Sequence, residues 1–301
     1  MTADKPMVAA GLIIATMFLL GFFDNLVRQI APDVGLWQFH LFRSLIALPF
    51  LVGISAMGWV NMRAIRKWAV MLRGGLAAFA ILIYFGCLGF LPVGQVAAGL
   101  FTAPIWVMLI SAIFLGKPIG MTRMAAALIG FAGVLIVLNP FEDGLSLIAL
   151  VPIAAGVIYA IGSIATRQWC EGESAAAMLF FFFLWLGLFG LIGSLILNLA
   201  VSAEDGTDPG YLLRGFVWPT AWSWLLIAAQ AFGSLLAVGL LFRAYQLADA
   251  AQVSVYEYSM LPFAAVWSLL LYGEPIRFNA IIGMALIVVS GVVISIRSRQ
   301  G

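Results

Sequence analysis

The chain consists of long apolar runs separated by short polar connections. Each run is 19 to 27 residues long and contains few charged residues. The hydrocarbon core of a bilayer is about 30 Å thick, and a helix needs about 20 mostly apolar residues to cross it. The pattern therefore predicts an all-α polytopic membrane protein with ten transmembrane helices. The predicted spans are 7–29, 35–57, 70–90, 94–115, 120–138, 146–166, 175–200, 220–246, 250–272 and 278–296.

The connections between these runs are too short to hold a soluble domain. Two of them are longer than the rest: 58–69 is rich in basic residues and Trp, and 201–219 carries several acidic residues. The first run follows Lys5 and could imitate a signal peptide, but it lacks a convincing small-residue cleavage site. We therefore expect it to stay in the protein as the first span.

The composition excludes whole classes of function. Hydrophobic residues make up 64% and charged residues 9% of the chain, against about 45–50% and about 25% in soluble domains, which excludes a soluble enzyme. A single histidine and the absence of an HExxH or GxSxG motif argue against a membrane-embedded hydrolase. The net charge of +2 is too small to suggest a nucleic-acid partner. Cys87 and Cys170 lack metal-ligand spacing, so we expect no metal site.

The distribution of Lys and Arg predicts the orientation of the chain, because cytoplasmic loops carry an excess of these residues. With the N-terminus inside, eleven fall on the cytoplasmic side and three on the outer side, whereas Arg43 falls within a span. We expect a multi-pass protein of the cytoplasmic (inner) membrane with both termini in the cytoplasm. The inner residues are Lys5, Arg63, Arg66, Lys67, Arg73, Lys117, Arg123, Arg167, Arg243, Arg297 and Arg299, and the outer ones are Arg28, Arg214 and Arg277.

An internal repeat relates the two halves of the chain. A shift of 157 residues aligns 85–119 with 242–276. In this register Gln-Val opens the fourth and ninth predicted spans, and Gly-x-Pro-Ile closes both. The repeat unit is then five spans, and an odd number of crossings forces the second copy into inverted topology. We expect the first repeat over 1–143 and the second, inverted repeat over 144–301.

The inverted repeat favours a secondary transporter over other kinds of membrane protein, because transporters often carry two inverted halves around a central site. A channel is the main alternative, but it would usually show rings of charge or an oligomeric filter, and the sequence indicates neither. The sequence contains no nucleotide-binding motif. Transport is therefore expected to be facilitated or coupled to an ion gradient.

These features resemble the drug/metabolite transporter superfamily, in its EamA-type branch. The most similar stretches are 242–247, 250–254 and 261–262, followed by the Gly-Glu-Pro-Ile segment at 273–276. Within the superfamily, the chain is most similar to the YddG-type aromatic amino-acid exporters. The first repeat departs from the family pattern at Lys117, where the family often has Glu.

The resemblance implies a central cavity lined mainly by spans one, three, four, six, eight and nine, with alternating access by rocking of the two halves. It implies export, no cofactor, and a small-molecule substrate, which we expect to be an aromatic or neutral amino acid. Pro104 and Pro262 near mid-span agree, because broken helices are tolerated where they line a cavity. The alternatives are a drug or other metabolite, proton coupling through Glu257, or a channel-like facilitator. A monomer is the expected oligomeric state.

Glu257 lies within the ninth predicted span, five residues before Pro262. A carboxylate at membrane depth is costly unless it faces a cavity or a partner, and such residues indicate function by default. Two interpretations remain. Either the carboxylate binds a substrate ammonium group or a transported proton, or it forms a structural ion pair or reaches interfacial water.

A second polar group lies in the first two spans and comprises Asp24, His40 and Arg43. Asp24 and Arg43 both lie toward the outer face and are predicted to pair, as a structural clamp or as a gate. His40 is the only histidine of the chain. It is either a hydrogen-bonded packing group or a proton relay.

Uncharged polar and aromatic residues complete the predicted substrate site. Glutamine amides can orient a zwitterion without trapping charge, although Gln95 also suits a structural role at a helix entrance. Mid-span aromatic rings suit flat apolar solutes, and helix packing or lipid contact is the alternative for each. The predicted substrate-binding residues are Tyr84, Gln95, Trp106, Tyr159, Ser163, Trp185, Gln230, Tyr256, Glu257 and Tyr258.

Overall fold

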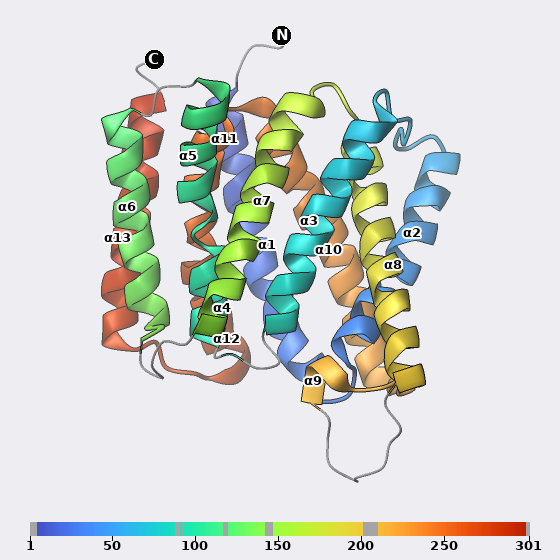
Figure 1. Cartoon of the computed structure of the whole chain (residues 1–301). Helices are drawn as coiled ribbons and strands as arrows, with labels where there is room; N and C mark the ends of the chain where they lie inside the picture. Colours follow the sequence, from blue (N-terminus) through green and yellow to red (C-terminus); the bar gives the residue numbers. More distant parts are fainter. Residues whose placement is uncertain are drawn as a thin grey trace.

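The computed structural model consists of helices and the connections between them, with no strand, in the part of the chain that it describes, which is residues 5–87, 91, 93–116, 120–141, 147–200 and 210–298 (Figure 1). The α-helices are α1 (Pro6–Ile30), α2 (Leu36–Ala56), α3 (Lys67–Cys87), α4 (Val93–Leu100), α5 (Ala103–Leu115), α6 (Met121–Leu138), α7 (Leu150–Trp169), α8 (Ala175–Ala200), α9 (Gly210–Leu213), α10 (Ala221–Leu247), α11 (Ala250–Tyr256), α12 (Met260–Tyr272) and α13 (Phe278–Ser298). Two short 3₁₀ helices are η1 (Leu147–Ala149) and η2 (Glu257–Ser259).

The helices coincide with the ten predicted spans, which confirms the predicted fold class. Within the described ranges, nine helical segments are long and apolar enough to cross a membrane. The remaining predicted span, 250–272, is divided into α11, η2 and α12. Figure 1 shows α11 and α12 at opposite ends of the bundle, so this span also runs from one face to the other.

Breaks interrupt the fourth and ninth spans at equivalent positions. Each break is followed by a proline, which lacks a backbone N–H and crowds the preceding turn. A hydroxyl side chain bonds a backbone carbonyl at each break: Thr102 Oγ1 donates to Gly99 O at 2.6 Å, and Ser259 Oγ donates to Tyr256 O at 2.7 Å. The two hydroxyls are 157 residues apart, as are the two carbonyls. The repeat register therefore extends to the hydrogen bonds of the break.

The helices pack as two inverted five-helix repeats. α6 packs against α13, α2 against α8, α1 against α10, and α3 against α7. These contacts map onto one another when the first five spans are exchanged with the second five. Where α6 meets α13, Ser290 Oγ donates to Ala126 O at 2.6 Å. At the equivalent point, Gly133 lies so close to Gly283 that a Cβ atom added to Gly133 would be 2.5 Å from the Gly283 carbonyl oxygen.

The start of α1 and the end of α13 lie at one face of the bundle (Figure 1), which we call the N-terminal face. Hydrogen bonds between connections hold this face together. The Glu173 carboxylate accepts from the backbone N–H groups of Ile65 and Arg66 at 2.8 and 2.5 Å. Gln246 Nε2 donates to the carbonyl oxygens of Cys170 and Glu173 at 2.7 and 2.9 Å. The location of this face in the cytoplasm stays a prediction.

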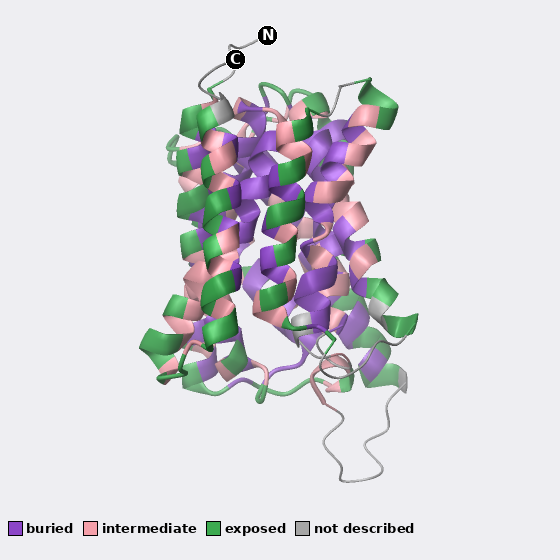
Figure 2. Ribbon diagram, turned by 90° about the vertical axis from the view of Figure 1, so that its left-hand side faces the viewer, coloured by how far each residue is buried: buried purple, intermediate pink, exposed green. Residues whose placement is uncertain are grey.

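Buried residues fill the middle of the bundle, whereas exposed residues lie along its outward faces (Figure 2). Many exposed side chains are apolar: Phe114 is 76%, Leu199 88% and Leu270 67% exposed. Such a surface is stable against lipid, so the chain is a multi-pass membrane protein whose polar side chains of interest lie inside. Lys117 and the predicted repeat boundary between residues 143 and 144 fall outside the described residues, and the boundary stays a prediction.

Candidate functional site

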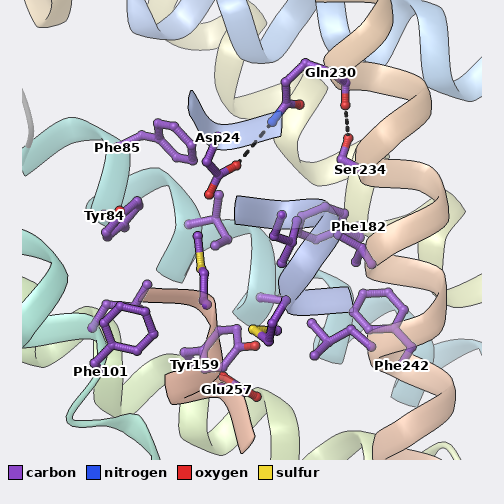
Figure 3. Close-up of a pocket in the computed structure, with 18 of the residues that line it drawn as sticks. Asp24, Tyr84, Phe85, Phe101, Tyr159, Phe182, Gln230, Ser234, Phe242 and Glu257 are labelled. Atoms are coloured by element: carbon purple, nitrogen blue, oxygen red, sulfur yellow. Dashed lines mark hydrogen bonds between the residues drawn. The ribbon is translucent and has the colours of Figure 1, made fainter. Parts of the chain in front are cut away.

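A central cavity of about 110 Å³ lies between the two repeats (Figure 3). A buried water needs about 10–15 Å³ of such space, so the cavity has room for several. Side chains from α1, α3, α4, α7, α10, η2 and α12 line it, in agreement with the spans that the family resemblance implied. The second and seventh spans add one side chain each, Arg43 and Phe182.

Most of the lining residues occupy equivalent positions in the two repeats. On the third and fourth spans of each repeat the offset is 157 residues, and on the first and second spans it is 139. The offset changes because the connection after the second span is longer in the second repeat than in the first. The pairs are Arg73 with Gln230, Ala77 with Ser234, Ile81 with Val238, Tyr84 with Leu241, Phe85 with Phe242, Leu100 with Glu257, Leu20 with Tyr159 and Arg43 with Phe182. The cavity is therefore symmetric in position but not in chemistry.

Asp24, Arg43 and Gln230 form a bridged cluster in this cavity. Arg43 Nη1 donates to Gln230 Oε1 at 3.0 Å, and Gln230 Nε2 donates to Asp24 Oδ1 at 3.4 Å (Figure 3 shows the second bond). The predicted direct pairing of Asp24 with Arg43 is thereby corrected. An amide offers both a donor and an acceptor, so Gln230 takes the position between the two charges. Whether the cluster acts as a clamp or as a gate stays a prediction.

His40 lies beside Arg43, outside the cavity lining. Its Nδ1 is 3.4 Å from Arg43 Nη2, and its ring packs edge-on against Phe85 with centroids 5.3 Å apart. Its Nε2 is buried without a hydrogen-bond partner among the described residues. Packing and a neighbouring cation favour the interpretation of His40 as a packing group over that of a proton relay.

Glu257 faces the same cavity from η2, on the side opposite Gln230 (Figure 3). Its side chain is buried, with 6% of the residue exposed. The Tyr245 hydroxyl donates to Oε1 of Glu257, and the Tyr159 hydroxyl is a second neighbour of the carboxylate. The structure shows no ion pair to Glu257 within its described ranges. The carboxylate therefore meets two neutral phenols and the cavity.

Arg73 is a cavity residue that the sequence did not single out. It is 3% exposed, Nε donates to Thr166 Oγ1 at 2.7 Å, and the guanidinium lies 3.4 Å from the centroid of the Phe242 ring. Its Nη1 is buried without a hydrogen-bond partner in the described part of the chain. The count of cytoplasmic charges placed Arg73 near a span end. α3 begins at Lys67, so Arg73 lies more than one turn inside the helix, where its side chain lines the cavity.

Four of the predicted substrate-binding residues line the cavity, and a fifth lies directly behind them. Ser163 does not line the cavity but contacts the hydroxyls of Tyr159 and Tyr245, the two phenols beside Glu257. The four lining residues are Tyr84, Tyr159, Gln230 and Glu257.

Two predicted tryptophans lie away from the cavity, and each donates its indole N–H to another residue of the protein. Trp106 Nε1 donates to Thr102 Oγ1 at 3.2 Å, beside the break in the fourth span. Trp185 Nε1 donates to Met71 O at 3.0 Å and joins α8 to α3. Both indoles satisfy their N–H groups within the fold, so the helix-packing alternative holds for them.

The remaining predicted residues point elsewhere because adjacent positions on a helix face different directions. Tyr258 packs so closely over Gly130 that a Cβ atom added to Gly130 would lie 2.5 Å from the Tyr258 ring. Tyr256 packs toward Gly291 on α13. Gln95 is buried in α4 but is not part of the cavity lining. Of the neighbours 256–258, only the central glutamate lines the cavity.

Phenylalanines form much of the cavity wall, and the sequence did not single them out. Phe85, Phe101, Phe182 and Phe242 line the cavity (Figure 3). A phenylalanine carries no polar atom that marks it at membrane depth, and the chain contains 23 of them. The repeat register was the available signal, because Phe85 and Phe242 match at the offset of 157.

The arrangement suits solute binding more than bond-breaking chemistry. Rings line the walls, and charged groups of both signs face the interior. Among the described residues no group of three His, Cys, Asp or Glu side chains could hold a metal ion. The site can bind a flat solute that carries polar groups, since aromatic faces bury area and the charged groups orient it.

Comparison with known proteins assigns the chain to a family. The sequence profile of the EamA-like transporter family matches twice, over residues 7–139 and 145–296. This chain belongs to the EamA-like transporter family. The EamA-like transporter also superposes on a solved crystal structure of a protein with a TM-score of 0.79, at 18% identity, over 98% of this chain and 99% of the other. That likeness supports the fold.

The curated relatives of this EamA-like transporter carry different solutes. A riboflavin transporter from Rhizobium johnstonii is 28% identical over 85% of this chain and 78% of its own length. A pseudopaline exporter from Pseudomonas aeruginosa is 24% identical over 98% of this chain and 99% of its own length. An S-adenosylmethionine uptake transporter from Rickettsia bellii is 25% identical over 80% of this chain and 76% of its own length. The chain is therefore a membrane transporter of this superfamily and not an enzyme, and these relatives do not point to YddG-type amino-acid exporters in particular.

Proposed function

We propose that this EamA-like transporter exports aromatic and other neutral amino acids through the central cavity. The observation that carries the proposal is a buried carboxylate, Glu257, in a cavity walled by Tyr84, Phe101 and Phe242. Aromatic walls favour a flat apolar side chain. A carboxylate is a strong acceptor for the α-ammonium group of an amino acid.

Alternating access is the transport mode that we propose, and the position of the cavity between the two repeats supports it. Each repeat contributes equivalent helices to the wall, so rocking of one repeat against the other exposes the cavity to one face and then to the other. The close α6–α13 contact at Gly133 and Gly283 supports a tight interface that both repeats share.

Coupling to an ion gradient depends on the role of Glu257. If the carboxylate only holds the substrate ammonium group, uptake does not respond to a pH gradient across the membrane. If it releases a proton when the substrate binds, uptake does respond. The absence of a cation beside Glu257 among the described residues supports both versions, because a proton or an ammonium group can then take that place.

A flat heteroaromatic solute is the second candidate substrate class. The observation that favours it is the 28% identity to a riboflavin transporter over 85% of this chain. Stacking against the phenylalanine walls would hold such a ring system. Riboflavin has no ammonium group, so its transport would not require the Glu257 carboxylate as a counter-charge.

The test is uptake by the purified protein reconstituted in liposomes. Labelled tryptophan, phenylalanine, methionine, lysine and riboflavin are compared, with and without an imposed pH gradient. We expect saturable uptake of tryptophan and phenylalanine and none of lysine. Glu257→Gln should lower tryptophan uptake at least tenfold without changing the melting temperature, whereas the matched variant Glu274→Gln, which alters an exposed carboxylate, should not. Uptake of riboflavin alone would refute the assignment of amino acids as substrates, but it would not refute the assignment of the protein as a transporter.

We further infer a monomer in the inner membrane, with the N-terminal face in the cytoplasm and the repeats divided between residues 143 and 144. The excess of Lys and Arg on that face supports the orientation. Fusion of a compartment-sensitive reporter to each terminus tests it, and opposite locations would overturn it. Light scattering of the detergent-solubilised protein tests the oligomeric state.

A further inference from the structure

Arg73 and Arg43 are both cavity residues, but their surroundings differ. Each is 3% exposed and lines the cavity. Arg43 donates to the Gln230 carbonyl, and Asp24 follows one hydrogen bond further on. Arg73 has the Thr166 hydroxyl at Nε and an aromatic ring below, and its Nη1 is buried without a partner among the described residues. Arg43 Nε is buried without a partner as well, so the difference lies in the acid: Arg43 has Asp24 within its cluster, and Arg73 has no acidic partner among the described residues.

The repeat register accounts for this difference. Arg73 occupies in the first repeat the position that Gln230 occupies in the second. Gln230 lies between the two charged members of the bridged cluster, whose equivalents at the offset of 139 are Ser163 and Phe182. The acid Asp24 thus corresponds to a hydroxyl side chain, and the cation Arg43 corresponds to an aromatic ring. In the described part of the chain, no carboxylate lies at the acceptor position beside Arg73.

Two tyrosines are neighbours of both Arg73 and Glu257. Tyr245 donates to the Glu257 carboxylate, and both Tyr245 and Tyr159 lie near Arg73 as well as near this carboxylate. A cation without an acid and an acid without a cation thus face one cavity, with neutral groups between them. Buried charges are stable when paired, so this end of the cavity is complete only with a ligand that carries both charges.

We propose that Arg73 binds the anionic group of the transported solute and that the transporter thereby selects for a free carboxylate. The inference rests on the proposed function and adds the second anchoring point: Glu257 receives the ammonium group, and Arg73 receives the carboxylate. The free Nη1 supplies a charge-assisted hydrogen bond, which is stronger than one between neutral groups. Phe242, already under the guanidinium, provides a ring face for the solute side chain.

The test compares tryptophan with tryptophanamide, which differs only in the carboxamide. Both compete against labelled tryptophan in proteoliposomes at pH 6, where both carry the ammonium group. We expect tryptophanamide to compete about 10- to 100-fold more weakly with the wild-type protein, the usual range for one hydrogen bond to a charged group. In Arg73→Gln, the apparent affinity for tryptophan should fall by the same factor, whereas that for tryptophanamide should not change. Equal competition by the two ligands in the wild type overturns the inference.

Two further variants show whether charge or fold is responsible. Arg73→Lys keeps the cation and should retain a preference for the acid of at least severalfold. Arg28→Gln removes an arginine of the exposed Arg28–Glu274 pair and should leave the preference unchanged. If Arg73→Gln does not fold, the wild-type comparison of acid and amide still decides.

A binding measurement separates this inference from the proposed function. If no amino acid is transported, the proposed function fails, but Arg73 can still be tested by thermal stabilisation of the purified protein. Indole-3-propionate should then stabilise it at about 10-fold lower concentration than indole-3-propionamide. No difference between these two ligands, or transport restricted to uncharged riboflavin, overturns the role of Arg73.

Discussion

The two charged ends of the cavity accommodate buried charge in opposite ways. In the bridged cluster, Gln230 joins Asp24 and Arg43, so both charges have a partner supplied by the protein. At the other end, the partners of Arg73 and Glu257 among the described residues are all neutral. One position of each end is equivalent in the inverted repeat, because Arg73 corresponds to Gln230. The comparison teaches that one symmetric scaffold can hold a bridged charge cluster at one end of the cavity and, at the proposed binding site, charges with neutral partners.

The largest effect is expected from removal of the cation in the bridged cluster. Arg43→Ala leaves Gln230 without its donor and Asp24 without a positive neighbour. Breaking a buried charge cluster at one member costs about 3–5 kcal/mol, and we expect about 3 kcal/mol because Asp24 also faces the cavity. The free energy of unfolding in mixed micelles measures it.

The control for Arg43→Ala is Arg28→Ala, which removes an arginine whose side chain is 56% exposed. Its unfolding free energy should match the wild type within error, because exposed ion pairs contribute little. An equal loss in both variants would mean that the bridged cluster is no more structural than a surface pair.

The next effect is expected from removal of the bridge itself. Gln230→Met keeps the length of the side chain but leaves Arg43 and Asp24 without the amide. Loss of hydrogen bonds to buried charged groups costs about 1–3 kcal/mol. The same unfolding measurement checks it, with Gln230→Glu as the matched variant that keeps an acceptor for Arg43. A gain in stability on Gln230→Met would show that the two charges prefer to pair directly.

A smaller effect is expected when the acid of the bridged cluster is copied to the other end. Ser163 is the equivalent of Asp24, so Ser163→Asp brings a carboxylate toward Arg73. The new carboxylate competes with that of the solute, and we expect tryptophan affinity to fall about tenfold, which is about 1.4 kcal/mol. Competition assays in proteoliposomes measure it. Ser163→Asn, of the same size without the charge, should retain the affinity, and equal losses in both would refute the charge argument.

The smallest effect is expected outside the membrane, at Glu274. Hydrogen bonds from Arg28 and Ser268 lower the pKa of its carboxyl from 4.5 to about 2. Because the folded pKa lies below the unfolded one, any stabilisation is present above pH 4.5 and lost as the pH falls toward 2. The pair is exposed, so Glu274→Gln should leave the melting temperature at pH 7 unchanged within error. A series of melting curves from pH 7 to pH 3 checks this, and a clear loss already at pH 7 would contradict it.

The number and limits of the helices could be read from the sequence. The predicted second span, 35–57, is α2 at Leu36–Ala56, and the predicted eighth span, 220–246, is α10 at Ala221–Leu247. Lipid requires an unbroken apolar length, and that length is visible in the order of residues. The inverted repeat was visible for the same reason, because motifs such as Gly-x-Pro-Ile recur at a constant offset.

The candidate site could be read only in part. Glu257, Gln230 and Tyr159 stood out because a polar atom at membrane depth needs a partner. Arg73 did not, because an arginine near a predicted span end counts as a cytoplasmic charge. Tyr258 was predicted to bind substrate, yet its ring covers Gly130 on α6 while the adjacent Glu257 enters the cavity.

The sequence by itself therefore determined the membrane-spanning helices, the inverted repeat and the presence of buried charge. The tertiary structure alone decided which charges are satisfied. Arg43 and Gln230 are 187 residues apart, and Arg73 and Thr166 are 93 apart. Whether two such side chains meet depends on how their helices are rotated and packed against distant partners. A rotation of one residue turns a side chain about 100° away from the cavity, and the apolar pattern of a helix surrounded by lipid and protein does not encode that rotation.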